Sequence, residues 1–127
     1  MTRAAVTGLV LAFAGITLGG GCGGIGSGGG GRAVPGGSAD RGADLISSYG
    51  CGSCHTIGGI DGANAHVGPS LDGLSNRIYI AGRLPNNPRN LIRWIRYPQQ
   101  IYPGNVMPDL GISDHDARDI AAYLYQH

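Results

Sequence analysis

Two cysteines and a histidine stand within five residues of one another, in the sequence Cys51-Gly-Ser-Cys54-His55. At this spacing two thiols can bond to the vinyl groups of one haem while the adjacent imidazole ligates its iron. We therefore predict that Cys51 and Cys54 attach one haem c covalently and that His55 is the proximal ligand. This requirement constrains the fold more than any other feature, because a short chain must then wrap around the cofactor.

Two other chemistries also use closely spaced cysteines. A thioredoxin-like redox pair stands in a βαβ unit, whereas the residues around Cys51 are rich in glycine and in helical patterns. A structural zinc ion needs four ligands, and Cys51, Cys54 and His66 would supply only three. Neither alternative requires a histidine directly after the second cysteine, so haem attachment is the favoured interpretation.

The second axial ligand of the iron has few candidates, because Met1 and Met107 are the only methionines. Met1 begins a targeting segment, whereas Met107 stands in a loop bracketed by Pro103 and Pro108. We predict that Met107 is the distal ligand. The alternative for Met107 is an ordinary place in the core. The histidines that compete for the iron are His66, foremost, and then His115 and His127.

Ligation by His55 and Met107 would leave the iron with no open position. Such a site moves electrons rather than activating oxygen, and a methionine ligand raises the reduction potential. We therefore predict that the protein is a single-electron carrier and not an enzyme. Such a carrier could also be a subunit of an oxidoreductase complex. If Met107 does not bind the iron, the alternative is a haem-based gas sensor or a peroxidase-like enzyme.

Residues on both sides of the haem motif carry a resemblance to a known family. Gly42 and Ile46 precede the motif, and Ile120 and Tyr123 follow near the end of the chain at helical spacing. With Met107 between them, these residues make the chain from about 38 to 125 resemble the class I cytochromes c. The resemblance implies an all-α fold in which three or more short helices and loops wrap around one haem, with the first and last helices crossing.

The same resemblance implies roles for three further residues. The turn Gly68-Pro69-Ser-Leu71 matches a turn of the family in which the proline carbonyl accepts the imidazole proton of the proximal ligand and the leucine packs on the haem ring. Trp94 falls where many members place a large aromatic side chain against the haem or its propionates. Pro69, Leu71 and Trp94 are therefore expected to bind the cofactor.

Residues 68–125 are also similar to the cytochrome c domain fused to subunit II of some bacterial haem-copper oxidases. This likeness implies a respiratory donor or relay whose partner is a terminal oxidase, a quinol–cytochrome c reductase or a periplasmic dehydrogenase. The sequence shows no copper-binding domain and no transmembrane hairpin, so we expect at most a free-standing counterpart of that domain.

Capping residues mark three helices in the sequence without reference to the family. Ser38, Asn87 and Ser113 each precede an apolar pattern, Asn87 is followed by a proline, and Asp116 stands where a capping box has Glu. No convincing strand is predicted. The expected helices cover residues 38–49, residues 88–97, and a last stretch that begins at Ser113 and has Ile120, Tyr123 and Leu124 as its buried stripe.

The chain before the haem domain is not of globular composition. Residues 1–22 combine an early arginine with a short apolar run, which is typical of an export signal, and end at Cys22. We expect Cys22 to be lipidated and to hold the protein on the outer face of the cytoplasmic membrane, with an uncleaved anchor or release into the periplasm as alternatives. Residues 23–37 are predicted to be a glycine-rich linker, and residues 38–127 the haem domain.

Charge gives a weaker indication of the partner. All nine basic residues are arginines and all eight acidic residues are aspartates, which gives a net charge of +1. A net charge so close to zero argues against a nucleic-acid partner. The five arginines between Arg77 and Arg96 have no acidic residue among them. They would neutralise haem propionates, steer docking to an acidic partner, or simply form a solvated face.

Overall fold

The computed structural model describes residues 32–127, so the predicted export signal, Cys22 and most of the predicted linker lie outside the described residues. The described chain is built from four α-helices, two short 3₁₀ helices and one two-stranded pairing. The predicted all-α class is confirmed by this architecture. No helix among the described residues is long and apolar enough to cross a membrane.

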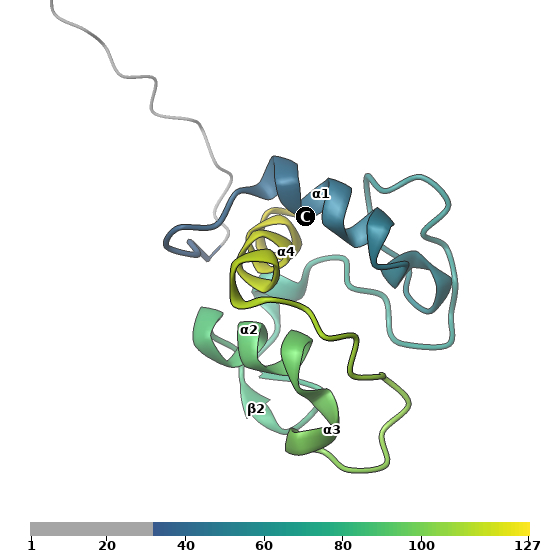
Figure 1. Ribbon diagram of the computed structural model, residues 1–127, viewed down its shortest axis with the longest axis vertical. Helices are drawn as coiled ribbons and strands as arrows, with labels where there is room; N and C mark the ends of the chain where they lie inside the picture. Colours follow the sequence, from purple (N-terminus) through teal and green to yellow (C-terminus); the bar gives the residue numbers. More distant parts are fainter. Residues whose placement is uncertain (1–31) are drawn as a thin grey trace, which may run out of the picture.

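The first and last helices cross at a glycine. Helix α1 (Ala39–Ser48) lies across α4 (Asp114–Gln126), as Figure 1 shows. A Cβ atom on Gly42 would lie 2.2 Å from the backbone oxygen of Asp119, so only glycine allows this separation of the helices. Ile46, one turn later, is fully buried. The crossing that the family resemblance implied is therefore present.

A buried carboxylate stands at this crossing. Asp119 accepts a hydrogen bond from the backbone N–H of Ser38 at 2.7 Å and pairs with Arg41 at 2.9 Å. Burial alone would raise its pKa, but these donors and the nearby His115 hold the pKa of Asp119 below its ordinary value. The N-cap of α1 is thereby tied to the first half of α4.

Helix α2 (Pro88–Arg96) packs against α4 from another side (Figure 1). It begins as predicted, with the Asn87 side chain accepting a hydrogen bond from the Asn90 N–H at 2.9 Å. Its buried face consists of Leu91, Ile92 and Ile95. A further helix, α3 (Pro98–Ile101), follows at once and was not predicted, because it is only one turn long.

Short elements connect the helices. They are the 3₁₀ helices η1 (Cys51–Ser53) and η2 (Leu74–Asn76) and the antiparallel strands β1 (Tyr79–Ile80) and β2 (Leu84–Pro85). The expectation of no strand is wrong at this hairpin, since two residues are too few to show an alternating pattern. Its turn places Ala81 and Gly82 at positive φ angles of 50° and 66°.

A buried amide joins these connections to the last helix. Asn86 donates from Nδ2 to the carbonyl oxygens of Leu74 at 2.7 Å and Arg77 at 2.9 Å. Its Oδ1 accepts a hydrogen bond of 2.6 Å from the hydroxyl of Tyr125, whose pKa is raised to about 12 by burial. All the side-chain polar groups of Asn86 are therefore used inside the protein.

The last residues of the predicted linker lie against the domain. Val34 is buried, and Arg32 donates hydrogen bonds to the backbone oxygens of Ser75 and Asn86. A Cβ atom on Gly37 would lie 2.7 Å from the backbone oxygen of Arg118. Residues 32–37 thus contact the haem domain rather than projecting from it.

Candidate haem-binding site

All seven predicted site residues line one cavity of about 360 Å³. Its walls are largely apolar and come from α1, α2, α4 and the loops between them. The residues that the sequence analysis assigned to haem are Cys51, Cys54, His55, Pro69, Leu71, Trp94 and Met107, and each contributes to the lining. The cavity therefore brings together thiol, imidazole and thioether groups from segments far apart in the chain.

The attachment motif forms a compact turn at the edge of this cavity. Gly50 adopts a φ of 70° after α1, which lets the chain reverse into η1. The backbone N–H groups of Cys54 and His55 both bond to the carbonyl oxygen of Cys51. Both cysteines are free thiols, and burial raises the pKa of the Cys51 thiol. The turn thus presents two thiols and an imidazole to the same apolar space.

The ring of His55 is oriented by the turn that follows the motif. Its Nδ1 lies 2.7 Å from the carbonyl oxygen of Pro69, which is a hydrogen-bond distance. When Nδ1 carries the proton, Nε2 is left as the free donor atom for a metal. Gly68 must be glycine here, because a Cβ atom would lie 2.3 Å from Cε1 of His55.

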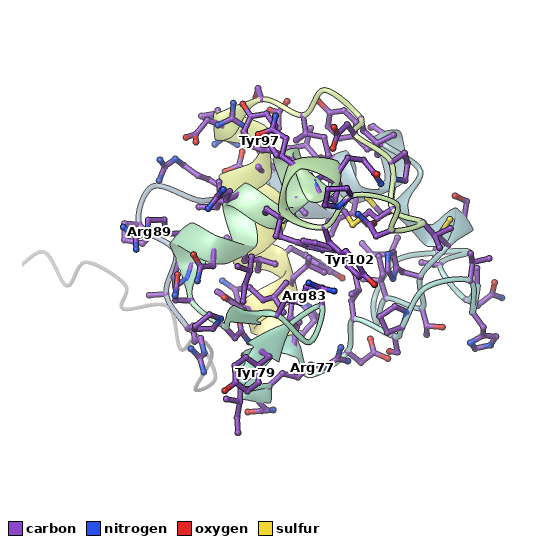
Figure 2. The ribbon with its side chains drawn as sticks, turned by 90° about the horizontal axis from the view of Figure 1, so that it is seen from below. Arg77, Tyr79, Arg83, Arg89, Tyr97 and Tyr102 are labelled. Carbon is purple, nitrogen blue, oxygen red and sulfur yellow. The ribbon has the colours of Figure 1, made fainter. Side chains whose placement is uncertain are left out.

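Arg77 braces the same turn from the far side. It donates hydrogen bonds from Nη2 to the backbone oxygens of Ser70 at 2.6 Å and Asp72 at 3.2 Å. Arg77 and Tyr79 both line the cavity, and they lie near each other at one edge of the molecule in Figure 2. The sequence analysis left Arg77 within a run of arginines, because sequence spacing alone did not separate this bracing residue from solvated ones.

The loop that carries Met107 lies on another wall of the cavity. It runs from the end of α3 to Ile112, and Asn105, Val106 and Met107 all line the cavity. The Met107 N–H donates a hydrogen bond of 2.8 Å to Oδ1 of Asn105. The sequence analysis did not identify Asn105 as a site residue, and it named Gly68 only as part of a turn, since the roles of both depend on close approach in space.

The rival histidines lie away from this cavity. His66 is exposed, with its Nδ1 3.4 Å from the hydroxyl of Thr56. His115 is exposed on α4, and the ring of His127 stacks on Tyr123 with centroids 4.0 Å apart. None of the three lines the cavity. Among residues 32–127 no group of three or more His, Cys and acidic side chains is placed to hold a metal ion, so the zinc alternative gains no support.

The residues present fit a covalently bound haem. Two cysteine thiols, an imidazole and a thioether line one largely apolar cavity, whose lining also includes Arg77. The fold and the site together define a class of small helical proteins that hold haem c through a single attachment turn.

Comparisons with known proteins agree with this class. A sequence model of the family described as cytochrome c matches residues 39–127. The protein therefore belongs to the cytochrome c family, whose members bind covalently attached haem c with its iron, and it is a carrier of electrons of the cytochrome c type.

Sequence relatives point to oxidase subunits. The chain is 39% identical over 87 residues to "Cytochrome c oxidase subunit 2" of Alkalihalophilus pseudofirmus, covering 68% of this chain and 25% of the relative. It is 30% identical over 89 residues to the protein of the same name from Bacillus subtilis, with the same shares covered. The chain thus spans about a quarter of the length of these curated relatives.

Solved structures show the same fold. Cytochrome c2 from Rhodobacter sphaeroides superposes with a TM-score of 0.54 at 24% identity, covering 71% of this chain and 95% of that one. Cytochrome c2 from Paracoccus denitrificans gives a TM-score of 0.52 at 20% identity, with the same shares covered. At these identities the likeness establishes the class I cytochrome c fold alone.

Proposed function

We propose that the protein carries single electrons in a bacterial respiratory or periplasmic chain, using a haem c attached through Cys51 and Cys54 and ligated by His55 and Met107. The observation that carries the proposal is the position of all four side chains on one apolar cavity. Haem iron supplies a one-electron couple, and ligation by histidine and methionine raises its potential.

The protein's own contribution would be to hold the ligands and exclude water. The Pro69 carbonyl fixes the tautomer of His55, and the apolar walls lower the dielectric around the site. Trp94 lines the cavity and is only partly buried, so its indole N–H would be available to a polar group of the cofactor. A filled sixth position would leave a gas sensor or peroxidase no place to bind its ligand.

Electrons would pass through an apolar docking surface. Six large hydrophobic side chains stay exposed in the described chain, and four of them, Val67, Tyr79, Val106 and Leu110, line the cavity. The six residues, which we term the apolar rim, are Val67, Ile78, Tyr79, Tyr102, Val106 and Leu110. Clustered exposed apolar side chains mark interaction sites. We infer that the redox partner meets this rim with an apolar surface of its own.

The relatives suggest which partner this is. Three proteins named cytochrome c oxidase subunit 2 share 30% identity or more with the haem domain. We propose that the domain relays electrons to or within a terminal oxidase. A quinol–cytochrome c reductase would suit the same surface as the donor, and a periplasmic dehydrogenase is the alternative.

Tethering to a membrane completes the proposal. It rests on the sequence of residues 1–22 and on Cys22, which lie outside the described residues. Lipidation of Cys22 would hold the domain on the outer face of the cytoplasmic membrane and raise its effective concentration near membrane complexes. Expression of the full chain followed by membrane fractionation and mass analysis tests this step, because Cys22→Ser should release the protein from the membrane fraction.

Absorption spectra of the holoprotein test the ligation. We expect wild-type oxidised protein to show the weak long-wavelength iron–sulfur charge-transfer band, and Met107→Ala to lose it. Gln100→Ala is the matched control, since Gln100 is an exposed residue of the neighbouring helix α3 that does not line the cavity, and it should keep the band. If the wild type lacks the band and binds carbon monoxide as readily as Met107→Ala, the electron-carrier proposal gives way to a sensor or enzyme.

A further inference from the structure

We propose that Gln99 is the positioning residue that keeps the Met107 loop in its ligand-bearing conformation. The inference rests on the proposed ligation by His55 and Met107, and deepens it by naming what holds the sixth ligand in place. Gln99 lies in the first turn of α3 and does not line the cavity, so it would act through the loop rather than on the cofactor.

One side-chain amide serves three backbone groups of the loop. Nε2 of Gln99 donates to the carbonyl oxygens of Asn105 at 2.8 Å and Met107 at 2.7 Å. Its Oε1 accepts a hydrogen bond of 3.2 Å from the Gly104 N–H. A primary amide has two N–H donors, and both are used here. No other side chain of the described protein contacts the backbone of this loop at three points through hydrogen bonds.

Met107 is consequently held from both sides. Gln99 bonds its carbonyl oxygen, and Asn105 accepts its N–H at 2.8 Å. Asn105 in turn donates to the carbonyl oxygens of Pro98 at 3.0 Å and Tyr102 at 2.6 Å. The loop beyond Met107 returns to the same place, because Asp109 accepts the backbone N–H of Gln99 at 3.2 Å. The loop therefore folds around Gln99.

Helix α3 is a fixed base for these contacts. Pro98, its first residue, is fully buried. At its other end the guanidinium of Arg83 lies 3.7 Å from the ring centroid of Tyr102, a cation–π contact that links α3 to the β1–β2 turn. Figure 2 shows Arg83 and Tyr102 side by side. Gln99 thus stands between two anchored points.

This arrangement matters because a thioether is an uncharged, weak ligand. Whether it stays on a metal depends on how far the loop populates the closed conformation, and each net hydrogen bond that holds the loop shifts that population several-fold. An external ligand that competes for the sixth position binds in proportion to the open population. Loss of the three Gln99 hydrogen bonds should therefore raise the apparent affinity for such a ligand roughly 10- to 100-fold.

The test is a titration of ferric holoprotein with imidazole. Gln99→Ala should bind imidazole roughly 10- to 100-fold more tightly than wild type. Gln100→Ala is the matched control, since Gln100 is the exposed neighbour and makes no side-chain hydrogen bond in the described protein, and it should behave as wild type. Gln99→Glu keeps the size of the side chain but loses its two N–H donors, so it should also weaken ligation, which a role in packing alone would not require.

The outcomes separate this inference from the proposed function. One outcome is that wild type shows the iron–sulfur band, but neither Gln99→Ala nor Gln99→Glu binds imidazole more tightly than Gln100→Ala does. In that case Met107 ligates the iron, and Gln99 does not position it. If wild type lacks the band and binds imidazole as tightly as Met107→Ala, the ligation itself is wrong. Far-UV circular dichroism of each variant checks that its helices persist. If Gln99→Glu is folded and binds imidazole only as tightly as wild type, the hydrogen-bonding argument is overturned, even if Gln99→Ala binds imidazole more tightly.

Discussion

Replacing Gly42 by alanine should force apart the two helices that frame the haem domain. The added Cβ atom would lie 2.2 Å from the Asp119 backbone oxygen and 2.9 Å from Cβ of Tyr123. The nearest atom belongs to the backbone of α4, which cannot rotate away, so α1 would have to move by about 1 Å to reach an ordinary contact distance.

The change in the free energy of unfolding is the cost of overpacking minus the gain from the higher helix propensity of alanine. Inserting a methyl group into a packed contact costs about 1–3 kcal/mol, and this contact belongs at the upper end because backbone atoms are involved. Alanine recovers about 1 kcal/mol relative to glycine inside a helix. The net loss is therefore about 2 kcal/mol, which for a domain of this size lowers the Tm by about 8–16 °C.

Thermal unfolding of the holoprotein, followed by far-UV circular dichroism, measures this loss. Asp44→Ala is the control, since Asp44 is exposed on the same helix and forms no ion pair in the described chain, and its Tm should change little. A Tm for Gly42→Ala equal to or above that of wild type would show that α1 and α4 do not meet at this glycine in the holoprotein.

Three further predictions concern the site, the buried carboxylate and the docking surface. Gly68→Ala should displace the His55 ring and break its hydrogen bond to the turn, which potentiometry should detect as a changed reduction potential and imidazole titration as altered axial ligation. Asp119→Asn should lower the free energy of unfolding at neutral pH. Because the folded-state pKa of Asp119 is depressed, wild type loses this stabilisation as pH falls through about 4 and below. Urea titrations across pH should therefore show the unfolding free energies of the two proteins converging in acid. A difference in unfolding free energy that stays constant with pH would contradict the pKa argument. Electron transfer to a purified haem-copper oxidase should depend weakly on ionic strength and slow several-fold in Val106→Ser, whereas a steep salt dependence would indicate charged docking instead.

The sequence predicted the long helices well because their start signals are local. The side chains of Ser38 and Ser113 accept hydrogen bonds from the N–H groups of Arg41 and Asp116, three residues on, as N-caps do. The predicted capping box is only half formed, because the Asp116 carboxylate accepts a hydrogen bond from the hydroxyl of Tyr49, the residue that follows α1, instead. The start of the helix thus depends on a local motif, whereas the hydrogen bond of the Asp116 side chain depends on Tyr49, which is distant in the sequence.

Other features could not be predicted, because their cause is not local. Helix α3 is one turn long, and the hairpin strands have two residues each, which is too short for a periodic pattern. The haem motif and Met107 were identified from chemistry and scarcity, and the cavity brings them together. Nothing in the order of residues distinguishes Gln99 from Gln100, since only the folded loop determines which amide meets three backbone groups.

The hydrogen bonds of Asn86 have a consequence for the speed of electron exchange. They connect Tyr125, deep in the last helix, to the carbonyl of Arg77, whose guanidinium holds the turn that orients His55. Such a path of satisfied polar contacts makes the surroundings of His55 stiff. A carrier gains or loses a unit of charge at every cycle, and each structural readjustment adds to the activation barrier. A stiff proximal side would keep this reorganisation energy small, so that the oxidised and reduced proteins share nearly one shape.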